Sequence, residues 1–274
     1  MSSFLKNEMG MSTGLINRLK WQNKIFVNGV SRHNDYTVQP GDVITAALDE
    51  ETPQYPAQDG PLTVLYEDAH ILAVDKPAGM LIHPSRATMV DTLANRVLGY
   101  YQKTGQCCAF HPVTRLDRDT FGVVLLAKNA HVHALFNQLH NHGALKKTYH
   151  ALVLGGPETD SGMIDAPIAR KPLPSLLRYV NQEGKPAVTR YQVLERGKHT
   201  SLLALQPITG RTHQLRVHCA YMGFPILGDP QYGSAHAKTY APSQQLCAKH
   251  LEFTHPVTGE YLCLTSRLDV GNIC

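Results

Sequence analysis

The sequence lacks the long apolar runs that insertion into a membrane requires. No stretch of the 274 residues approaches the length needed to cross a bilayer. The N-terminal segment MSSFLKNEMG contains Lys6 and Glu8 and has no apolar core of signal-peptide length. These absences predict a cytoplasmic protein with no membrane partner.

Metal-binding motifs are also missing. Six cysteines are present, but their spacings match neither a zinc ribbon nor a CxxC redox pair. Fifteen histidines include no HExxH arrangement, and the two histidines of HVH (131–133) would point to different sides of a helix. We therefore expect reduced, mostly structural thiols and no metal site.

The chain has little excess of one charge. Its net charge is +4 and its sequence pI is about 8.7, which permits a nucleic-acid partner without requiring one. Hydrophobic residues make up 43% and charged residues 18%, which indicates a globular rather than a disordered chain. The length suits one large domain or two unequal ones.

The patterns indicate two units. Residues 1–58 combine a helical segment, MSTGLINRLKWQ, with short strands around an Asn28-Gly29 turn, and they end in a linker rich in proline. Residues 59–274 contain many strands with few crossover helices, which predicts an α+β domain with a mainly antiparallel mixed sheet and flanking helices. Thr88 and Asp91 are predicted to cap the helix that runs through VLGYY.

The segment TRLDRDTFG (114–122) places Asp117 between Arg115 and Arg118. Two neighbouring guanidinium groups favour the ionised form of a carboxylate. Such a group is a poor general acid but a credible nucleophile or charge stabiliser. The same pattern is typical of a solvated surface ion-pair ladder of little energetic weight, and the segment alone favours that second interpretation.

The segment TGRTHQLRVH (209–218) is predicted to begin a helix, with Thr212 near its start. His213 and Arg216 would share a face away from the main apolar stripe, and Arg211 would lie at the helix entrance. Two cations near a helix N-terminus suit a phosphate. A solvated face with one basic residue per turn explains the pattern equally well.

Two further segments have competing interpretations. Tyr149, in LKKTYHALVLG, begins a strand and is either a hydrogen-bonded core tyrosine or a platform for a base or sugar. Lys76, in DKPAGMLIHPS, is predicted to belong to a structural turn between strands, although that turn could carry it to a ligand.

Taken in order, these segments resemble the RluA-type pseudouridine synthases. The likeness covers the chain from about 61 to 262, and eight segments in family order are highly specific. They are VDKPAGMLIHPS, TRLDRDTFG, LKKTYHALVLG, IDAPIAR, GKPAVTRYQVLE, PITGRTHQLRVH, GFPILGDPQYG and LEFTHPVTGE. Residues 1–58 resemble an S4-type RNA-binding domain, with MSTG where that domain usually has a Ser-Arg pair.

The resemblance implies the pseudouridine synthase fold and the isomerisation of uridine to pseudouridine in ribosomal or transfer RNA. It implies no cofactor and no metal, and we expect a monomer. Asp117 would be the catalytic carboxylate, Arg216 would pair with it and Tyr149 would stack on the target uracil. The substrate-binding residues would be Arg115, Arg211 and His213. The RNA-binding residues would be Arg18, Lys20 and Lys24.

Two positions depart from the family pattern: Thr114 stands in place of a histidine, and Phe121 in place of a serine. We expect Phe121 to be a packing residue with its ring turned inward. The departures keep a second hypothesis open, an RNA-binding protein on the same fold with weak or lost catalysis. A third hypothesis, a glycosidase-type hydrolase with Asp117 as nucleophile, requires a second carboxylate, for which Asp119 is the only neighbour.

Overall fold

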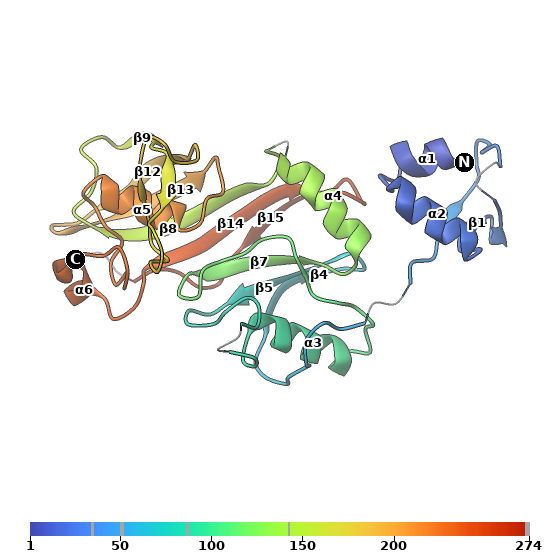
Figure 1. The fold of residues 1–274 in the computed structure, drawn as a ribbon, viewed down its shortest axis with the longest axis horizontal. Helices are drawn as coiled ribbons and strands as arrows, with labels where there is room; N and C mark the ends of the chain where they lie inside the picture. The colour runs from blue at the N-terminus through green and yellow to red at the C-terminus, as the bar shows by residue number, and fades with distance from the viewer. Residues whose placement is uncertain (34–35, 50–51, 86–87, 142, 272–274) are drawn as a thin grey trace.

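The structure is a computed structural model that describes residues 1–33, 36–49, 52–85, 88–141 and 143–271 (Figure 1). Its N-terminal part has its own small sheet and its own apolar core, separate from the rest of the chain. The elements of this part are α1 (Ser2–Asn7), α2 (Thr13–Trp21), β1 (Ile25–Val27), β2 (Val30–Ser31) and β3 (Ile44–Ala46).

Local sequence explains how this small unit turns. Asn28 and Gly29 have φ values of +51° and +79°, as a two-residue hairpin turn between β1 and β2 requires. Ser12 caps α2, because its side chain accepts a hydrogen bond from the Leu15 N–H. The order of the sheet is β2-β1-β3. The expected arrangement of one helix and short strands around the Asn-Gly turn is confirmed, with α1 added before it.

The large body is built on one mixed sheet with the order β4-β5-β7-β14-β8-β13-β12-β9; β15 also pairs with β14, and β6 with β7. Every pairing is antiparallel except that of β7 with β14. The strands are β4 (Thr63–Glu67), β5 (Ile71–Lys76), β6 (His111–Pro112), β7 (Phe121–Ala127), β8 (Lys146–Leu154), β9 (Ser161–Asp165), β12 (Val188–Arg196), β13 (Thr200–Pro207), β14 (Leu246–Thr254) and β15 (Tyr261–Thr265). The predicted α+β class is confirmed.

In the part of the chain that the structure describes, four helices and one hairpin accompany this sheet: α3 (Leu93–Lys103), α4 (Ala130–Asn141), α5 (Gln214–Tyr221), α6 (Ala235–Tyr240) and the hairpin of β10 (Ile168–Arg170) with β11 (Arg178–Val180). In Figure 1, α3 and α4 lie on opposite sides of β5 and β7. Successive residues of β5 point to opposite faces of the sheet. Leu72 therefore packs in the core with α3, and Ile71 packs in the core with α4. Helix α5 packs its Leu215 and Cys219 against the other half of the sheet.

The two halves of the sheet meet where β7 runs parallel to β14. Phe121 and Gly122 pair with Cys247 and Ala248. Gly122 has φ +109°, and a Cβ placed there would lie 2.4 Å from the Ala248 carbonyl oxygen, so only glycine fits this close approach. The loop that carries Asp117 therefore leads directly into the junction between the two halves.

One predicted helix start is wrong. Helix α3 begins after Thr92, whose side chain forms a reciprocal capping box with Asn95, whereas Asp91 has φ +60° and bonds to Gln58. Helix α5 begins after His213, which has φ +57°, so Thr212 lies near its start as expected. Among the described residues, none of the helices is long and apolar enough to cross a bilayer.

Candidate active site

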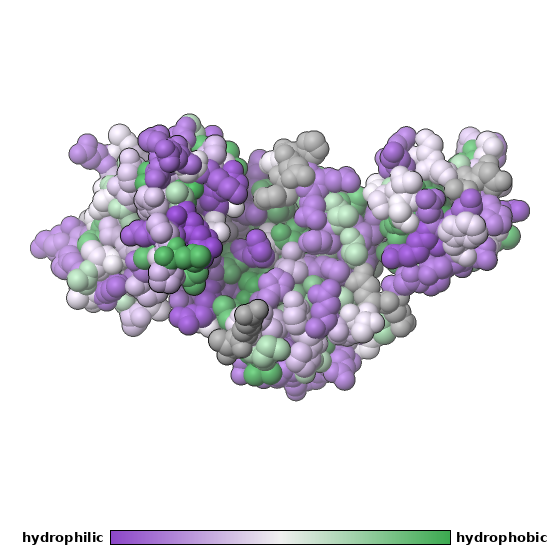
Figure 2. Space-filling view, viewed as in Figure 1, coloured by the Kyte–Doolittle hydropathy of each residue, from purple (hydrophilic) through white to green (hydrophobic). Residues whose placement is uncertain are grey.

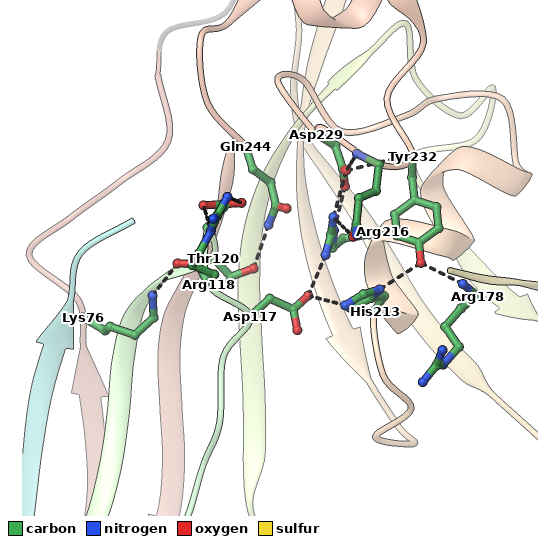
Figure 3. Close-up of polar contacts among 12 residues, drawn as sticks. Lys76, Asp117, Arg118, Thr120, Arg178, His213, Arg216, Asp229, Tyr232 and Gln244 are labelled. Carbon is green, nitrogen blue, oxygen red and sulfur yellow. Dashed lines mark hydrogen bonds and ion pairs between the residues drawn. The ribbon is translucent and has the colours of Figure 1, made fainter. Parts of the chain in front are cut away.

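Asp117 and Arg216 meet at the junction although 99 positions separate them in the chain (Figure 3). Asp117 lies in the loop before β7, and Arg216 lies in the first turn of α5. The Arg216 Nη1 donates to the Asp117 Oδ2 at 3.0 Å. The pairing of these two residues that the family resemblance implied is therefore present in the structure.

Arg216 is held by a second carboxylate, which the sequence did not single out. Its Nε and Nη2 donate to both oxygens of Asp229, at 2.7 and 2.9 Å, and its Nη2 also donates to Gln231. Burial opposes ionisation of Asp229, but the hydrogen bonds and charge of Arg216 and two backbone N–H groups outweigh it and lower the pKa of Asp229.

The expected orientation of Arg216 is wrong. Arg216 was predicted to lie away from the buried stripe of α5, but it is only 4% exposed, and Asp229 is fully buried. Burial disfavours the charge on Arg216, but the two carboxylates raise its pKa above the ordinary value. A buried guanidinium is acceptable here because each of its three nitrogens donates to an acceptor and the centre of the Tyr232 ring lies 5.0 Å away.

The two arginines that flank Asp117 are not its partners. Arg118 bonds to Asp119, with Nε at 3.1 Å from Oδ1, and Arg115 is exposed, with no hydrogen bond to any residue in the described ranges. The expected Arg115–Asp117–Arg118 cluster therefore does not form. The cation beside Asp117 comes from α5 instead.

His213 lies on the other side of the same carboxylate. Its Nε2 is 3.8 Å from the Asp117 Oδ2, and its Nδ1 is 2.8 Å from the Tyr232 hydroxyl oxygen. The Arg178 backbone N–H donates to that hydroxyl, so the hydroxyl proton is free to donate to Nδ1, which leaves the imidazole proton on Nε2, toward Asp117. Burial, more than the opposing effect of Asp117, lowers the pKa of His213.

Tyr149 is near enough for the Asp117 charge to affect it. Burial first, and then Asp117, raise the pKa of the Tyr149 phenol above its usual value, so the phenol stays protonated at neutral pH. Tyr149 lies within β8 rather than at its start, and it lines a small pocket. In the space-filling view, the front of the molecule is hollowed between its two halves, with apolar side chains inside the hollow (Figure 2).

Lys76 supports the Asp117 loop through a hydrogen bond to the loop backbone. Its fully buried ammonium donates to three backbone carbonyl oxygens, those of Pro77 and Met80 in its own turn and that of Arg118 in the loop, at 2.8–2.9 Å. Burial, against the opposing charges of Asp119 and Asp117, lowers the pKa of Lys76 to about 8. The turn expected at this segment is present, but its lysine also joins two loops.

The two residues that depart from the family pattern are both buried. Phe121 is 8% exposed, so the expected inward position of its ring is confirmed. Thr114 accepts a hydrogen bond from the Leu125 N–H through its hydroxyl and lines the pocket beside Tyr149. Neither residue interrupts the contacts between Asp117 and Arg216.

Other predicted binding residues lie away from Asp117 or are already paired. Arg211 is exposed, and its Nε donates to the Pro186 carbonyl oxygen at 2.9 Å. In the N-terminal unit, Arg18 and Lys24 both contact Asp49, which reduces the charge that they can offer to RNA. Lys20 is half-buried, with no ion pair to a carboxylate in the described part of the chain.

Comparison with known proteins settles the family. The family described as RNA pseudouridylate synthase matches residues 70–221, a span that includes Asp117, Tyr149 and Arg216. "Uncharacterized RNA pseudouridine synthase YjbO" of Bacillus subtilis is 36% identical over 92% of this chain and 90% of its own. "Ribosomal large subunit pseudouridine synthase D" of Nitrosomonas europaea is 39% identical over 82% and 67%.

The chain belongs to the RluA-type family of RNA pseudouridine synthases. It is therefore an isomerase that acts on RNA. The fold agrees, since the structure of "Human RNA Pseudouridylate Synthase Domain Containing 4" superposes with a TM-score of 0.60 at 27% identity, over 77% of this chain and 89% of that one.

Two residues of the site, Asp229 and Tyr232, were not predicted from the sequence. The supporting role of Lys76 was not predicted either. Asp229 and Tyr232 lie in GFPILGDPQYG, which resembled a family segment but showed no periodicity or charge pattern that indicated contact with Arg216. The described residues include no group of three or more His, Cys, Asp or Glu side chains that could hold a metal ion.

Proposed function

We propose that Asp117 is the catalytic carboxylate of this synthase. One observation carries the proposal: Asp117 receives a single Arg216 N–H, while Asp229 and Gln231 accept the other hydrogen bonds of that guanidinium. The Asp117 side chain is 32% exposed, so one oxygen remains accessible to a substrate. An ionised, oriented and accessible carboxylate suits either attack on C1′ of the sugar or removal of a sugar proton.

The reaction breaks the N1–C1′ bond of uridine, turns the uracil and joins its C5 to C1′, while the C5 proton is lost and N1 gains one. Both roles of Asp117 require its ionised form, which Arg216 stabilises. Tyr149 is too weak an acid to act as a phenolate base, so it serves as the surface on which the flipped uracil stacks. Arg115, exposed two residues before Asp117, helps to hold the flipped nucleotide.

A direct test is Asp117→Asn, which removes the charge with almost no change in volume. We expect pseudouridine formation to fall by at least about 100-fold while RNA affinity stays within a few-fold. Asp119→Asn is the matched control in the same loop and should retain activity. An Asp117→Asn variant that turns over at the parent rate would show that another group is catalytic, and a parent without activity would favour the RNA-binding hypothesis.

The substrate that we favour is large-subunit ribosomal RNA. The support is the name "Ribosomal large subunit pseudouridine synthase D", which belongs to relatives in Nitrosomonas europaea, Pseudomonas aeruginosa, Vibrio cholerae and Xanthomonas campestris at 35–39% identity. Mapping pseudouridine in ribosomal and transfer RNA from cells with and without the protein decides which of these two RNA classes is the substrate. Sites lost only from transfer RNA would overturn the assignment.

We further propose that the protein works as a cytoplasmic monomer. A ribosomal substrate places it with the ribosome in the cytoplasm. One chain supplies Asp117, Arg216, Asp229, His213 and Tyr149, so a second copy is not needed to complete the catalytic set. Sedimentation of the active protein tests the monomer, and activity confined to a dimer fraction would contradict it.

A further inference from the structure

The pocket beside Tyr149 contains a lysine that none of the roles above uses. Lys147 and Tyr149 are alternate residues of β8. The register shift in this stretch of the β8–β14 ladder has its extra residue on β14, between Ala248 and His250, so both β8 side chains leave the same face of the sheet. Two strand residues span about 7 Å. Both side chains line one pocket, together with Thr114, Val123, Ala248, His250 and Leu251.

The Lys147 ammonium has no partner among the described residues: neither a hydrogen bond nor an ion pair joins it to any of them. The charged group that acts on it, Arg115, has the same sign. Burial, and then the Arg115 charge, lower the pKa of Lys147, which means that the folded protein holds two repelling cations together. Such an arrangement costs stability unless an anion approaches the two cations.

RNA supplies an anion at a suitable distance. If the target uracil stacks on Tyr149, the sugar–phosphate backbone on either side of that nucleotide passes within a few ångströms of the base. A cation about 7 Å along the same face is then within reach of a neighbouring phosphodiester. Lysine binds phosphate as a compact point charge, and an unpaired lysine has no carboxylate to release first.

We propose that Lys147, with Arg115 beside it, binds a backbone phosphate next to the target uridine. The inference rests on the proposed function, because Tyr149 must hold the uracil. It assigns to Lys147 a role in binding and register rather than in chemistry. The competing explanation is structural: the aliphatic stem of Lys147 fills space beside Val123 and Leu251, and the charge itself does nothing.

Lys147→Met separates the two explanations, because methionine keeps an unbranched apolar stem and removes the charge. Lys146→Met is the matched control, since Lys146 is exposed and leaves the opposite face of the same strand. Lys147→Arg keeps the charge. The probe is a fluorescent single-stranded oligouridylate, whose affinity is measured by anisotropy across a series of salt concentrations. A second probe has the same sequence with uncharged methylphosphonate linkages.

We expect Lys147→Met to weaken binding of the charged probe and to reduce the slope of log K against log salt by about one. Lys146→Met and Lys147→Arg should keep the parent slope, and the uncharged probe should bind the parent and Lys147→Met alike. The inference fails if Lys147→Met keeps the parent slope, or if it loses as much affinity for the uncharged probe. In the second case the stem acts by packing.

Thermal melting checks that the variants are folded. If Lys147→Met melts early, Lys147→Arg and Lys147→Gln are compared at a temperature where both are folded, and equal salt slopes would overturn the inference. The proposed function is tested separately, by mapping pseudouridine in RNA. An active parent with no effect of Lys147→Met on the slope refutes the phosphate site alone, whereas an inactive parent refutes the proposed function.

Discussion

At the scale of single residues, Arg216 holds two carboxylates unequally. Asp229 is fully buried and receives two N–H groups from Arg216, together with the backbone N–H groups of Gln231 and Tyr232. Asp117 receives one N–H and is partly exposed. Asp229 therefore neutralises the Arg216 guanidinium and fixes its position. Arg216 and the two carboxylates together carry a net negative charge, and Asp117 is the carboxylate that a substrate can reach.

This arrangement predicts a large effect of Asp229→Asn. The substitution leaves Arg216 buried without its main counter-ion, and breaking a buried pair costs about 3–5 kcal/mol of unfolding free energy. Freed from Asp229, Arg216 also orients Asp117 less well, so kcat should fall with little change in RNA affinity. Denaturant unfolding and single-turnover rates on the same variant measure both effects.

The control is Asp160→Asn, which breaks an Asp–Arg pair at the surface, where Asp160 is 86% exposed and lies 2.7 Å from Arg196. Such pairs contribute about 0–1 kcal/mol. If Asp229→Asn cost no more stability than Asp160→Asn, Asp229 would not be the anchor of Arg216.

The residues of the site differ in how far sequence reveals them. Asp117, Tyr149 and Arg216 lie in segments that resemble a known family, so their place could be predicted. The partners of Asp117 could not, because adjacency in sequence suggested Arg115 and Arg118 while the fold brings Arg216 from 99 positions away. Arg216 is buried, although a basic residue on a short helix ordinarily faces solvent.

At the scale of elements, the Asp117 loop is fixed at both of its ends. Lys76, at the end of β5, donates to the Arg118 carbonyl oxygen, and the buried Gln244 donates through Nε2 to the Thr120 hydroxyl at 2.7 Å. Gly122 then brings β7 close to β14. The loop thus takes its shape from the strands of both halves of the sheet, which is the rigid support that an oriented carboxylate needs.

Lys76→Met tests this support. The variant leaves three carbonyl oxygens without their donor, and we expect a loss of about 2–4 kcal/mol in unfolding free energy and a slower reaction. Exposed Lys103 supplies the control variant, Lys103→Met, which should change little. A stable and fully active Lys76→Met variant would mean that the loop holds its shape without the ammonium.

The effect should also depend on pH. The folded pKa of Lys76, about 8, lies below the ordinary value of 10.5. Between these values the folded protein releases a proton that the unfolded chain keeps, so the stability contributed by Lys76 rises with pH. The difference in unfolding free energy between the parent and Lys76→Met should therefore grow from pH 8 to pH 10.5. A difference that shrinks over this range would contradict the assignment.

Elements were easier to predict than their ends. Period-two patterns and buried apolar runs indicated the strands and the α+β class, because each strand buries at least one face. The cap of α3 was misplaced because it depends on contacts outside the segment: Asn95 bonds to the Pro56 carbonyl oxygen, and Asp91 bonds to Gln58.

At the scale of the whole molecule, the end of the proline-rich segment contacts the large body. Gln58 bonds to Asp91 and Asn95 at the start of α3, and a Cβ at Gly99 of α3 would lie 2.2 Å from the Gln58 carbonyl oxygen. Tyr55 packs with the core beneath α3. We therefore propose that the residues from Tyr55 onward belong to the large body, a few positions before the end of the 1–58 unit predicted from sequence.

The proposed RNA-binding role of the N-terminal unit must rest on local contacts. Residues 1–58 contain five lysines and arginines against six aspartates and glutamates, so the unit offers no net positive charge. Asp49 already contacts Arg18 and Lys24. Among the three predicted contacts, Lys20 is the one without an ion pair to a described carboxylate, so we expect it to contribute most.

Removing residues 1–53 tests this role while keeping the contacts of Tyr55 and Gln58 with α3. We expect the remaining chain to fold and to keep its chemistry, because Asp117, Arg216 and Asp229 lie in the large body. Removing residues 1–60 should lower its unfolding free energy further, since the donors and packing against α3 are lost. Oligouridylate affinity should fall on removal of residues 1–53, and Lys20→Gln in the full chain should reproduce part of that fall. Anisotropy measured against salt decides the question: if neither the truncated protein nor Lys20→Gln differs from the parent in affinity or salt slope, the RNA-binding role of the unit is refuted.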